Sequence, residues 1–415
     1  MPIIKKVFAR EILDCRGRPT VEACCTLWGG ATGTASVPSG ASTGTAEAHE
    51  LRDRDPKRYG GYGCRKAVAH VNGEIAALLQ GKNWESQADV DRAMIHLDGT
   101  PQKSRLGANA ILAVSLAFAR AVAARKPTPL WKHFGGAGTL PQLTINLFSG
   151  GMHAGGQVEI QDALVVPIAA TTIGRALEMT FDVYAAAARI CAERYNMRLL
   201  RADEGGLAPP FPDVETMLST TVEAIERAGY KPGVDVAMAV DVASTHFYGS
   251  GIYTLGGQTL SSAQMIDRVI SWVDRFPIIS VEDGLSEDDW ENWPALRRAL
   301  SGRALTLGDD LLSTQTARIR RAIDAQAADA LLLKVNQCGT LTEAAEAYAL
   351  ARSAGWHVTL SVRSGDTEDS WPADLAAGWG VDQFKGGSIT QSERLAKYNR
   401  LLWLEECEGL KLCRR

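Results

Sequence analysis

Six charged residues follow short apolar runs in the second half of the chain: Asp241, Glu282, Asp309, Lys334, Arg363 and Lys385. From Glu282 onward they are spaced by 27, 25, 29 and 22 residues, about one strand-helix unit each. In a closed barrel of parallel strands, such residues gather at one mouth, where barrel enzymes have their active sites. One such residue would usually form a structural ion pair, but six in succession favour a functional site.

Three of these residues suit a metal, and the others suit an anionic substrate. Asp241, Glu282 and Asp309 offer hard oxygen ligands, which Mg²⁺ prefers. A proton beside a carboxylate is very weakly acidic, and a divalent metal stabilises the charge that its removal creates. Lys334 is the candidate base. Its pKa must then fall from about 10.4 toward neutrality, through burial and a cation such as Lys385.

The elements that position these residues are predicted from turn signals and periodicity. Residues 3–13 and 20–27 are rich in strand-forming residues, and residues 108–124 have apolar residues at helical spacing. A Pro- and Gly-rich segment, residues 127–141, then interrupts the pattern and marks a domain boundary. Beyond it, short apolar runs alternate with amphipathic helices such as residues 214–228. The sequence thus predicts two domains: a first one of strands followed by helices, and a second one built from alternating strand-helix units.

Composition limits the class of protein. The chain has 415 residues with 46% hydrophobic and 22% charged residues, which suits two globular domains. A net charge of -4 without a basic run argues against nucleic acid or a membrane as the main partner. We expect no signal peptide and no membrane span. The eight cysteines form no Cys-x-x-Cys pair, so reduced thiols in a cytoplasmic protein are expected.

The chain resembles enolase over nearly its whole length. The motifs that carry the resemblance occur in the expected order. They are Asp14-Cys-Arg-Gly17, Val37-Pro-Ser-Gly-Ala-Ser-Thr-Gly44, Leu106-Gly-Ala-Asn-Ala-Ile-Leu112, His153-Ala-Gly155, Asp203-Glu-Gly-Gly206, Ser280-Val-Glu-Asp283, Gly308-Asp-Asp-Leu311, Leu331-Leu-Leu-Lys-Val-Asn-Gln337, Arg363-Ser-Gly365 and Ser392-Glu-Arg-Leu-Ala-Lys-Tyr-Asn399.

The resemblance implies a fold, an assembly and a cofactor. The fold would be an N-terminal α+β capping domain, residues 1–134, followed by an enolase-type (β/α)8 TIM-like barrel, residues 135–415. The smallest assembly would be a homodimer, or a higher homo-oligomer of dimers. By motif match, Asp241, Glu282 and Asp309 correspond to ligands of a first Mg²⁺, and Ser42 to a ligand of a second.

The resemblance also implies catalytic roles. Lys334 matches the base, Lys385 the lysine that binds the substrate carboxylate, and Glu204 the acid that assists departure of the 3-hydroxyl. The substrate is a small anionic phosphate or phosphonate. Its phosphate-side contacts correspond to His153, Arg363 and Ser364.

Several positions around the site depart from the enolase pattern. Where the family has a histidine before Arg-Ser-Gly, this chain has Val362, whose side chain has no hydrogen-bond donor. The second acidic position, which pairs with Glu204, is Asp162, one methylene shorter than glutamate. Met152 stands in the lid motif, and Gln391 replaces an arginine. The family's Ser-Glu after the metal aspartate is Thr245-His246 in this chain.

These departures leave three functions open. The metal and base positions are intact while the leaving-group and phosphorus side is altered, which favours a diverged enolase with a changed substrate. An enzyme that makes carboxyphosphonoenolpyruvate in phosphonate antibiotic biosynthesis fits this pattern. The alternatives are an ordinary phosphopyruvate hydratase of glycolysis and a catalytically silent enolase-like binding protein.

Overall fold

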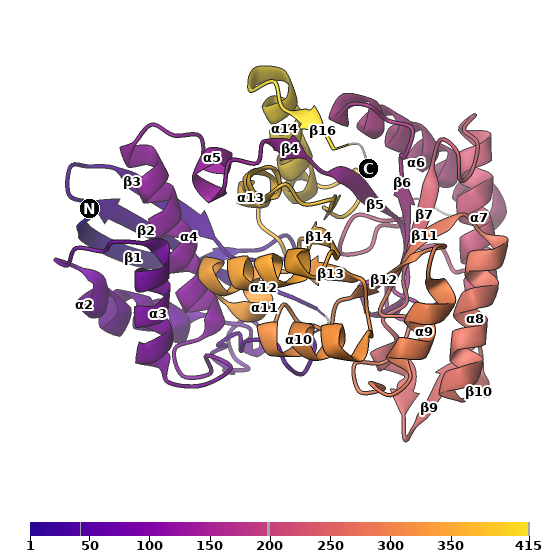
Figure 1. The fold of residues 1–415 in the computed structure, drawn as a ribbon, viewed down its shortest axis with the longest axis horizontal. Coiled ribbons are helices and arrows are strands. Elements are labelled where there is room, and N and C mark those ends of the chain that lie inside the picture. Colours follow the sequence, from indigo (N-terminus) through magenta and orange to yellow (C-terminus); the bar gives the residue numbers. More distant parts are fainter. Residues whose placement is uncertain (42, 197–199, 414–415) are drawn as a thin grey trace.

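The structure is a computed structural model that describes residues 1–41, 43–196 and 200–413. Its N-terminal part is an antiparallel sheet of β1 (Ile4–Leu13), β2 (Pro19–Leu27) and β3 (Thr32–Ser36), packed against helices (Figure 1). The helical elements here are η1 (Tyr59–Gly61), α1 (Arg65–His70), η2 (Val71–Ile75), α2 (Ala76–Leu79), α3 (Gln87–Asp98), α4 (Ala108–Arg125) and α5 (Leu130–Phe134).

Helix α4 is the central helix of this part. Its sequence is rich in Ala and branched apolar residues, and it packs against both β2 and β3. By length and composition alone it could cross a membrane, but 78% of it is buried inside the protein. Its apolar character is therefore explained by a place in the core.

The second part is a closed barrel of eight strands in the order β11-β12-β13-β14-β15-β5-β6-β7. This confirms the predicted barrel. The strands are β5 (Gln142–Ser149), β6 (Asp162–Val166), β7 (Ala237–Asp241), β11 (Ile278–Glu282), β12 (Leu305–Gly308), β13 (Ala330–Leu333), β14 (His357–Ser361) and β15 (Gln383–Lys385).

One strand of the barrel runs against the others. β6 pairs antiparallel with both β5 and β7, whereas the other adjacent pairs are parallel. The expectation of an all-parallel barrel is therefore wrong for β6. Because β6 is reversed, its first residue, Asp162, lies level with Ser149 and Asp241 at the ends of β5 and β7. The start of β6 therefore lies at the same mouth of the barrel as the carboxyl ends of β5 and β7.

Helices surround the barrel, and short elements close its loops. The helices are α6 (Ile173–Tyr195), α7 (Val214–Arg227), α8 (Ser262–Arg275), α9 (Trp293–Leu300), α10 (Thr316–Ala325), α11 (Val335–Cys338), α12 (Leu341–Ser353), α13 (Trp371–Trp379) and α14 (Ser392–Cys407). The short elements are η3 (Gly151–His153), η4 (Ser244–Phe247), a sheet of β8 (Tyr248–Gly249), β9 (Ile252–Leu255) and β10 (Gln258–Leu260), and a pair of β4 (Thr139–Leu140) with β16 (Lys411–Leu412).

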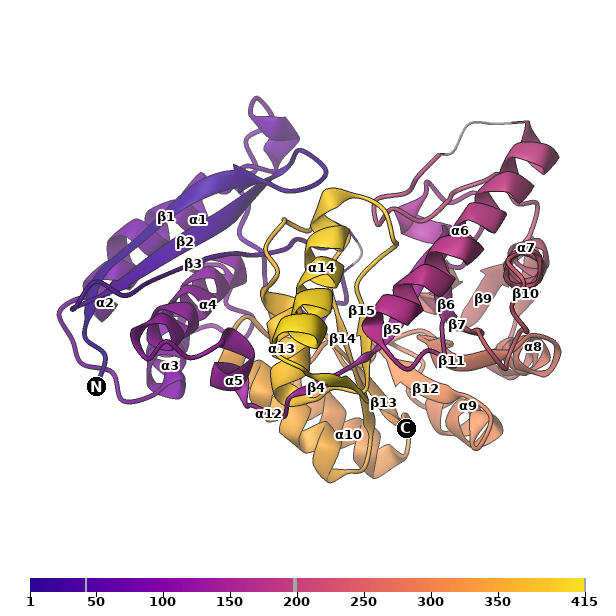
Figure 2. The same cartoon turned by 90° about the horizontal axis from the view of Figure 1, so that it is seen from above.

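The two parts lie side by side, and loops of the first reach the second (Figure 2). Ser39 forms an isolated β-bridge with Gly365, just beyond the end of β14. Arg120 of α4 forms an ion pair with Asp369, which also accepts a hydrogen bond from the backbone of Ser36. These contacts hold the Gly-rich segment that begins at Val37 against the barrel mouth.

Candidate active site

Two carboxylates and one lysine form the first cluster at the mouth. Asp241 and Glu282 end the neighbouring strands β7 and β11 and lie level in the sheet register. From the end of β15, Lys385 Nζ donates to Asp241 Oδ2 at 2.9 Å and to Glu282 Oε2 at 2.7 Å. All three side chains are buried. The apolar runs that precede them pack inside the barrel, which places these charges at the strand ends.

Lys334 and Asp309 form a second, adjacent pair. Lys334 follows β13 and donates from Nζ to Asp309 Oδ2, while Gln337 Nε2 donates to Asp309 Oδ1 at 2.8 Å. Burial lowers the pKa of Lys334, the Asp309 carboxylate raises it, and the cation of Arg363 lowers it again. The net direction is upward. The predicted fall in the pKa of Lys334 therefore requires that the carboxylate charge beside it be neutralised.

The carboxylates at the mouth fit a divalent cation. Burial raises the pKa of Glu282 well above its usual value, and the Asp241 carboxylate raises it further. Glu282 Oε1 is buried and has no hydrogen-bond partner among the described residues. The carboxylates of Asp241, Glu282 and Asp309 contact only two lysines, Lys334 and Lys385, so this group of side chains has a net negative charge when ionised. An oxygen-only, anionic donor set of this kind suits Mg²⁺ better than a soft metal.

Asp283 and Asp310 join Asp309 in a buried acidic cluster that the strand-end pattern missed. Ligand oxygens of the three residues lie within 4.8 Å of one another, close enough to hold a metal ion. Asp283 accepts hydrogen bonds from the backbone N–H groups of Asp309 at 2.9 Å and Asp310 at 2.7 Å. It therefore fixes the backbone that carries Asp309. Asp283 directly follows Glu282 in the sequence, and this position could have indicated its place at the mouth.

His153, Asp162 and Glu204 form a third buried cluster on the β5–β6 side of the mouth. His153 Nδ1 lies 3.0 Å from Asp162 Oδ2, and His153 Nε2 lies 3.8 Å from Glu204 Oε1. The other oxygen of Asp162 accepts from Asn146 Nδ2 at 2.6 Å and Ser149 Oγ at 2.9 Å. The imidazole therefore lies between the two carboxylates. Asn146 and Ser149 were not predicted.

The electrostatics of this cluster favour a protonated histidine. Burial lowers the pKa of His153, but the carboxylates of Asp162 and Glu204 raise it to about 9. Burial raises the pKa of Asp162, His153 lowers it, and Glu204 raises it again, with a net rise. Burial also raises the pKa of Glu204, but His153 and nearby cations lower it overall. The two carboxylates therefore hold the pKa of His153 above neutrality.

Arg363 and Ser364 connect the mouth to the Gly-rich segment. Arg363 donates from Nη1 to Glu47 Oε2 at 2.9 Å and from Nη2 to Glu47 Oε1 at 3.1 Å. Ser364 Oγ accepts from the backbone N–H of Ala41 at 2.8 Å. Gln337 donates to both Glu47 and Asp309, which links this pair to the second cluster. Glu47 was missed, although it follows Gly44 of the quoted motif by only three residues.

The predicted metal ligand Ser42 lies outside the described residues. Of the altered positions, Val362 is buried, and its backbone N–H donates to Lys385 O at 3.1 Å. Gln391 lies beside the Glu204 loop and donates from Nε2 to Ala202 O at 3.3 Å. Met152 is 57% exposed, and His246 lies in η4. Val362 and Gln391 therefore lie beside groups of the mouth.

Comparison with known families agrees with this geometry. Residues 4–134 match the family described as "Enolase, N-terminal domain", and residues 137–412 match "Enolase, C-terminal TIM barrel domain". The protein belongs to the enolase family, and it is an enolase-superfamily enzyme with acidic groups that could bind a metal.

Proposed function

We propose that the protein is a Mg²⁺-dependent lyase that removes the proton beside the carboxylate of a substrate resembling 2-phosphoglycerate or phosphoenolpyruvate. The observation that carries this proposal is the juxtaposition at one mouth of Lys334, bonded to Asp309, with the Lys385-bridged pair Asp241 and Glu282. Acidic groups for a metal and a lysine base are the pairing that enolase-superfamily chemistry uses.

The chain's own residues divide the work between them. Asp241, Glu282 and Asp309 would hold the metal, which supplies positive charge to the substrate carboxylate when bound. Neutralising Asp309 removes the main influence that raises the pKa of Lys334, so its amine is freed to take the proton. Lys385 binds the substrate carboxylate.

The opposite side of the mouth assists the leaving group. His153 holds a proton between Asp162 and Glu204, and the imidazolium is placed to protonate a departing hydroxyl directly or through Glu204. Asp162 is fully buried and positions the ring rather than meeting solvent. Arg363 and Ser364 bind the phosphorus group.

The finer proposal is a diverged enolase that makes carboxyphosphonoenolpyruvate from 2-phosphoglycerate and a phosphonoformate-derived co-substrate. The phosphonoformyl unit would replace the phosphate on the C2 oxygen, and water, inorganic phosphate and any group that the co-substrate carries would be released. Its support is the contrast between an intact metal and base set and an altered leaving-group and phosphorus side. Val362 places a buried apolar side chain directly before Arg363, where the family has histidine. Gln391, beside the Glu204 loop, carries no charge where the family has arginine.

Phosphorus NMR tests this proposal. The purified protein is incubated with Mg²⁺ and 2-phosphoglycerate, with and without the phosphonoformate-derived co-substrate. A new phosphonate signal that differs from that of the co-substrate, and that appears only when the co-substrate is present, supports the changed substrate. Brisk formation of phosphoenolpyruvate that ignores the co-substrate would instead identify an ordinary phosphopyruvate hydratase. The intact Lys334–Asp309 pair is also consistent with the function of an ordinary phosphopyruvate hydratase.

A further inference from the structure

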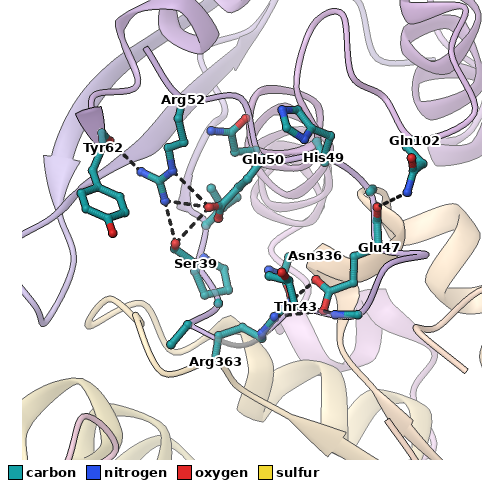
Figure 3. Close-up of a pocket in the computed structure, with 18 of the residues that line it drawn as sticks. Ser39, Thr43, Glu47, His49, Glu50, Arg52, Tyr62, Gln102, Asn336 and Arg363 are labelled. Carbon is teal, nitrogen blue, oxygen red and sulfur yellow. Dashed lines mark hydrogen bonds and ion pairs between the residues drawn. The ribbon is translucent and has the colours of Figure 1, made fainter. Parts of the chain in front are cut away.

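A cavity of about 490 Å³ lies between the Gly-rich segment and other parts of the N-terminal domain, with Asn336 and Arg363 of the barrel on its wall (Figure 3). Its volume falls in the range of small-molecule sites, roughly 300–1,000 Å³. Of the described residues predicted for the active site, Arg363 alone lines it. The cavity is therefore separate from the clusters around Lys334 and His153, but it shares one wall with the phosphorus side of the mouth.

Two of the three arginines that line the cavity are already paired. Arg52 donates to Glu50, to Ser39 Oγ at 2.6 Å and to two backbone carbonyls. Arg363 forms its two-pronged contact with Glu47, and Figure 3 shows both pairs on the cavity wall. These ion pairs shape the wall and fix the start and end of the Gly-rich segment.

The polar groups left over include several donors and one buried acceptor, Glu50 Oε1. The Arg18 guanidinium lies 4.5 Å from the Tyr62 ring centroid and has no carboxylate partner in the described part of the chain. Asn336 Oδ1 accepts from Arg363, while its amide nitrogen has no acceptor among the described residues. The His49 ring also lines the cavity without a described partner. Unpaired donors and one surplus positive charge favour a ligand rich in acceptors, which is an oxyanion.

We propose that this cavity binds an oxyanion-bearing second ligand, the co-substrate of the reaction, with its anionic group held by Arg18. This inference rests on the proposed function, which requires a second substrate. The cavity is larger than the volume of a phosphate-sized anion. Because further donors line the remaining space, we infer that the ligand has a second polar group besides its oxyanion.

The position of the cavity explains how such a ligand reaches the reaction. Arg363 joins the cavity wall to the mouth, where its charge acts on Lys334 and Asp309. Gln337 bridges Glu47 on the cavity side and Asp309 on the mouth side, at 3.4 Å and 2.8 Å. A ligand seated here therefore approaches the first substrate from its phosphorus end, opposite the end that Lys385 binds.

Calorimetry with phosphonoformate as the probe tests the site. The full chain carries Lys334→Ala to block turnover and is saturated with Mg²⁺ and 2-phosphoglycerate, so the mouth is filled. We expect phosphonoformate still to bind, and Arg18→Gln to raise its Kd about tenfold through loss of a charge-assisted hydrogen bond. His49→Ala, a second variant on a different side of the cavity from Tyr62, should raise the Kd by a smaller factor.

Arg65→Gln is the matched control, because Arg65 is exposed at the start of α1 and lies outside the cavity lining. An unchanged Kd in both Arg18→Gln and His49→Ala overturns the proposal, as does displacement of phosphonoformate by 2-phosphoglycerate. A different result sinks the proposed function alone: phosphonoformate binds through Arg18, yet phosphorus NMR of the active enzyme shows only phosphoenolpyruvate.

Discussion

The two halves of the barrel mouth are built in different ways. The base half comprises Asp241, Glu282, Asp309, Lys334 and Lys385. These residues lie at or next to the ends of parallel strands, and lysines neutralise carboxylates directly. The leaving-group half comprises His153, Asp162 and Glu204. Its residues come from two loops and the start of the reversed strand β6, and a histidine lies between two carboxylates. Regular topology carries the acidic groups that could bind a metal, while irregular backbone carries the histidine that lies between two carboxylates.

Replacing the proposed base, Lys334, should have the largest effect. In Lys334→Ala we expect kcat to fall by about 10³-fold, within the range that one general base contributes. Exchange of the substrate's C2 proton with deuterated water, followed by proton NMR, should fall in parallel. Lys231→Ala, at an exposed lysine outside the mouth, is the control. Exchange at the parental rate without Lys334 would remove it from the base half.

Metal binding should stabilise the base half strongly. At a Mg²⁺ concentration 100 times the Kd, we expect the free energy of unfolding to rise by about 2.7 kcal/mol relative to protein in EDTA. Glu282→Gln should abolish most of this gain, because it removes an anionic ligand. Denaturant titrations with and without Mg²⁺ measure both values. An equal gain in parent and variant would place the metal elsewhere, for example at the Asp283–Asp309–Asp310 cluster.

Alkaline pH should weaken the leaving-group half. The pKa of His153 is about 9 in the folded protein, above the unfolded value of about 6.5, so its ion pair stabilises the fold fully below pH 6.5. That contribution, of about 2 kcal/mol for a charged hydrogen bond, is lost as the pH rises through 9. Asp162→Asn should flatten the dependence of unfolding free energy on pH in this window. Asp182→Asn, at an aspartate that pairs with Tyr230, should not.

The smallest effect concerns the boundary between the halves. Val362→His returns a side-chain hydrogen-bond donor at the buried position directly before Arg363. We expect it to shift the ratio of phosphoenolpyruvate to co-substrate-dependent product about tenfold toward phosphoenolpyruvate, the equivalent of one hydrogen bond. Val362→Ile adds volume without a donor and is the control. Competing-substrate assays by phosphorus NMR give the ratio. A shift of the same size in both variants would assign the effect to packing.

The base half was predictable because each strand-helix unit repeats the same signal. An apolar run followed by a charge marks Glu282, Asp309, Lys334 and Lys385, and burial of the runs forces the charges to the ends. The direction of β6 was not predictable in this way, because the apolar pattern of a buried strand is the same whether the strand runs parallel or antiparallel to its neighbours. The support from Asn146 and Ser149 depends on that direction, and the contact between Glu47 and Arg363 depends on how the two domains dock.

The lysine bridges at the mouth also bear on the stage of folding at which the proposed metal would bind. Lys385 and Lys334 supply positive charge to the carboxylates from within the chain, so the acidic pocket assembles as the polypeptide folds rather than waiting for a template ion. Binding of the proposed metal would then be an exchange on a folded scaffold, in which the incoming cation competes with the ammonium groups of the two lysines. This differs from small metal-dependent domains, whose chains stay unfolded until the ion arrives.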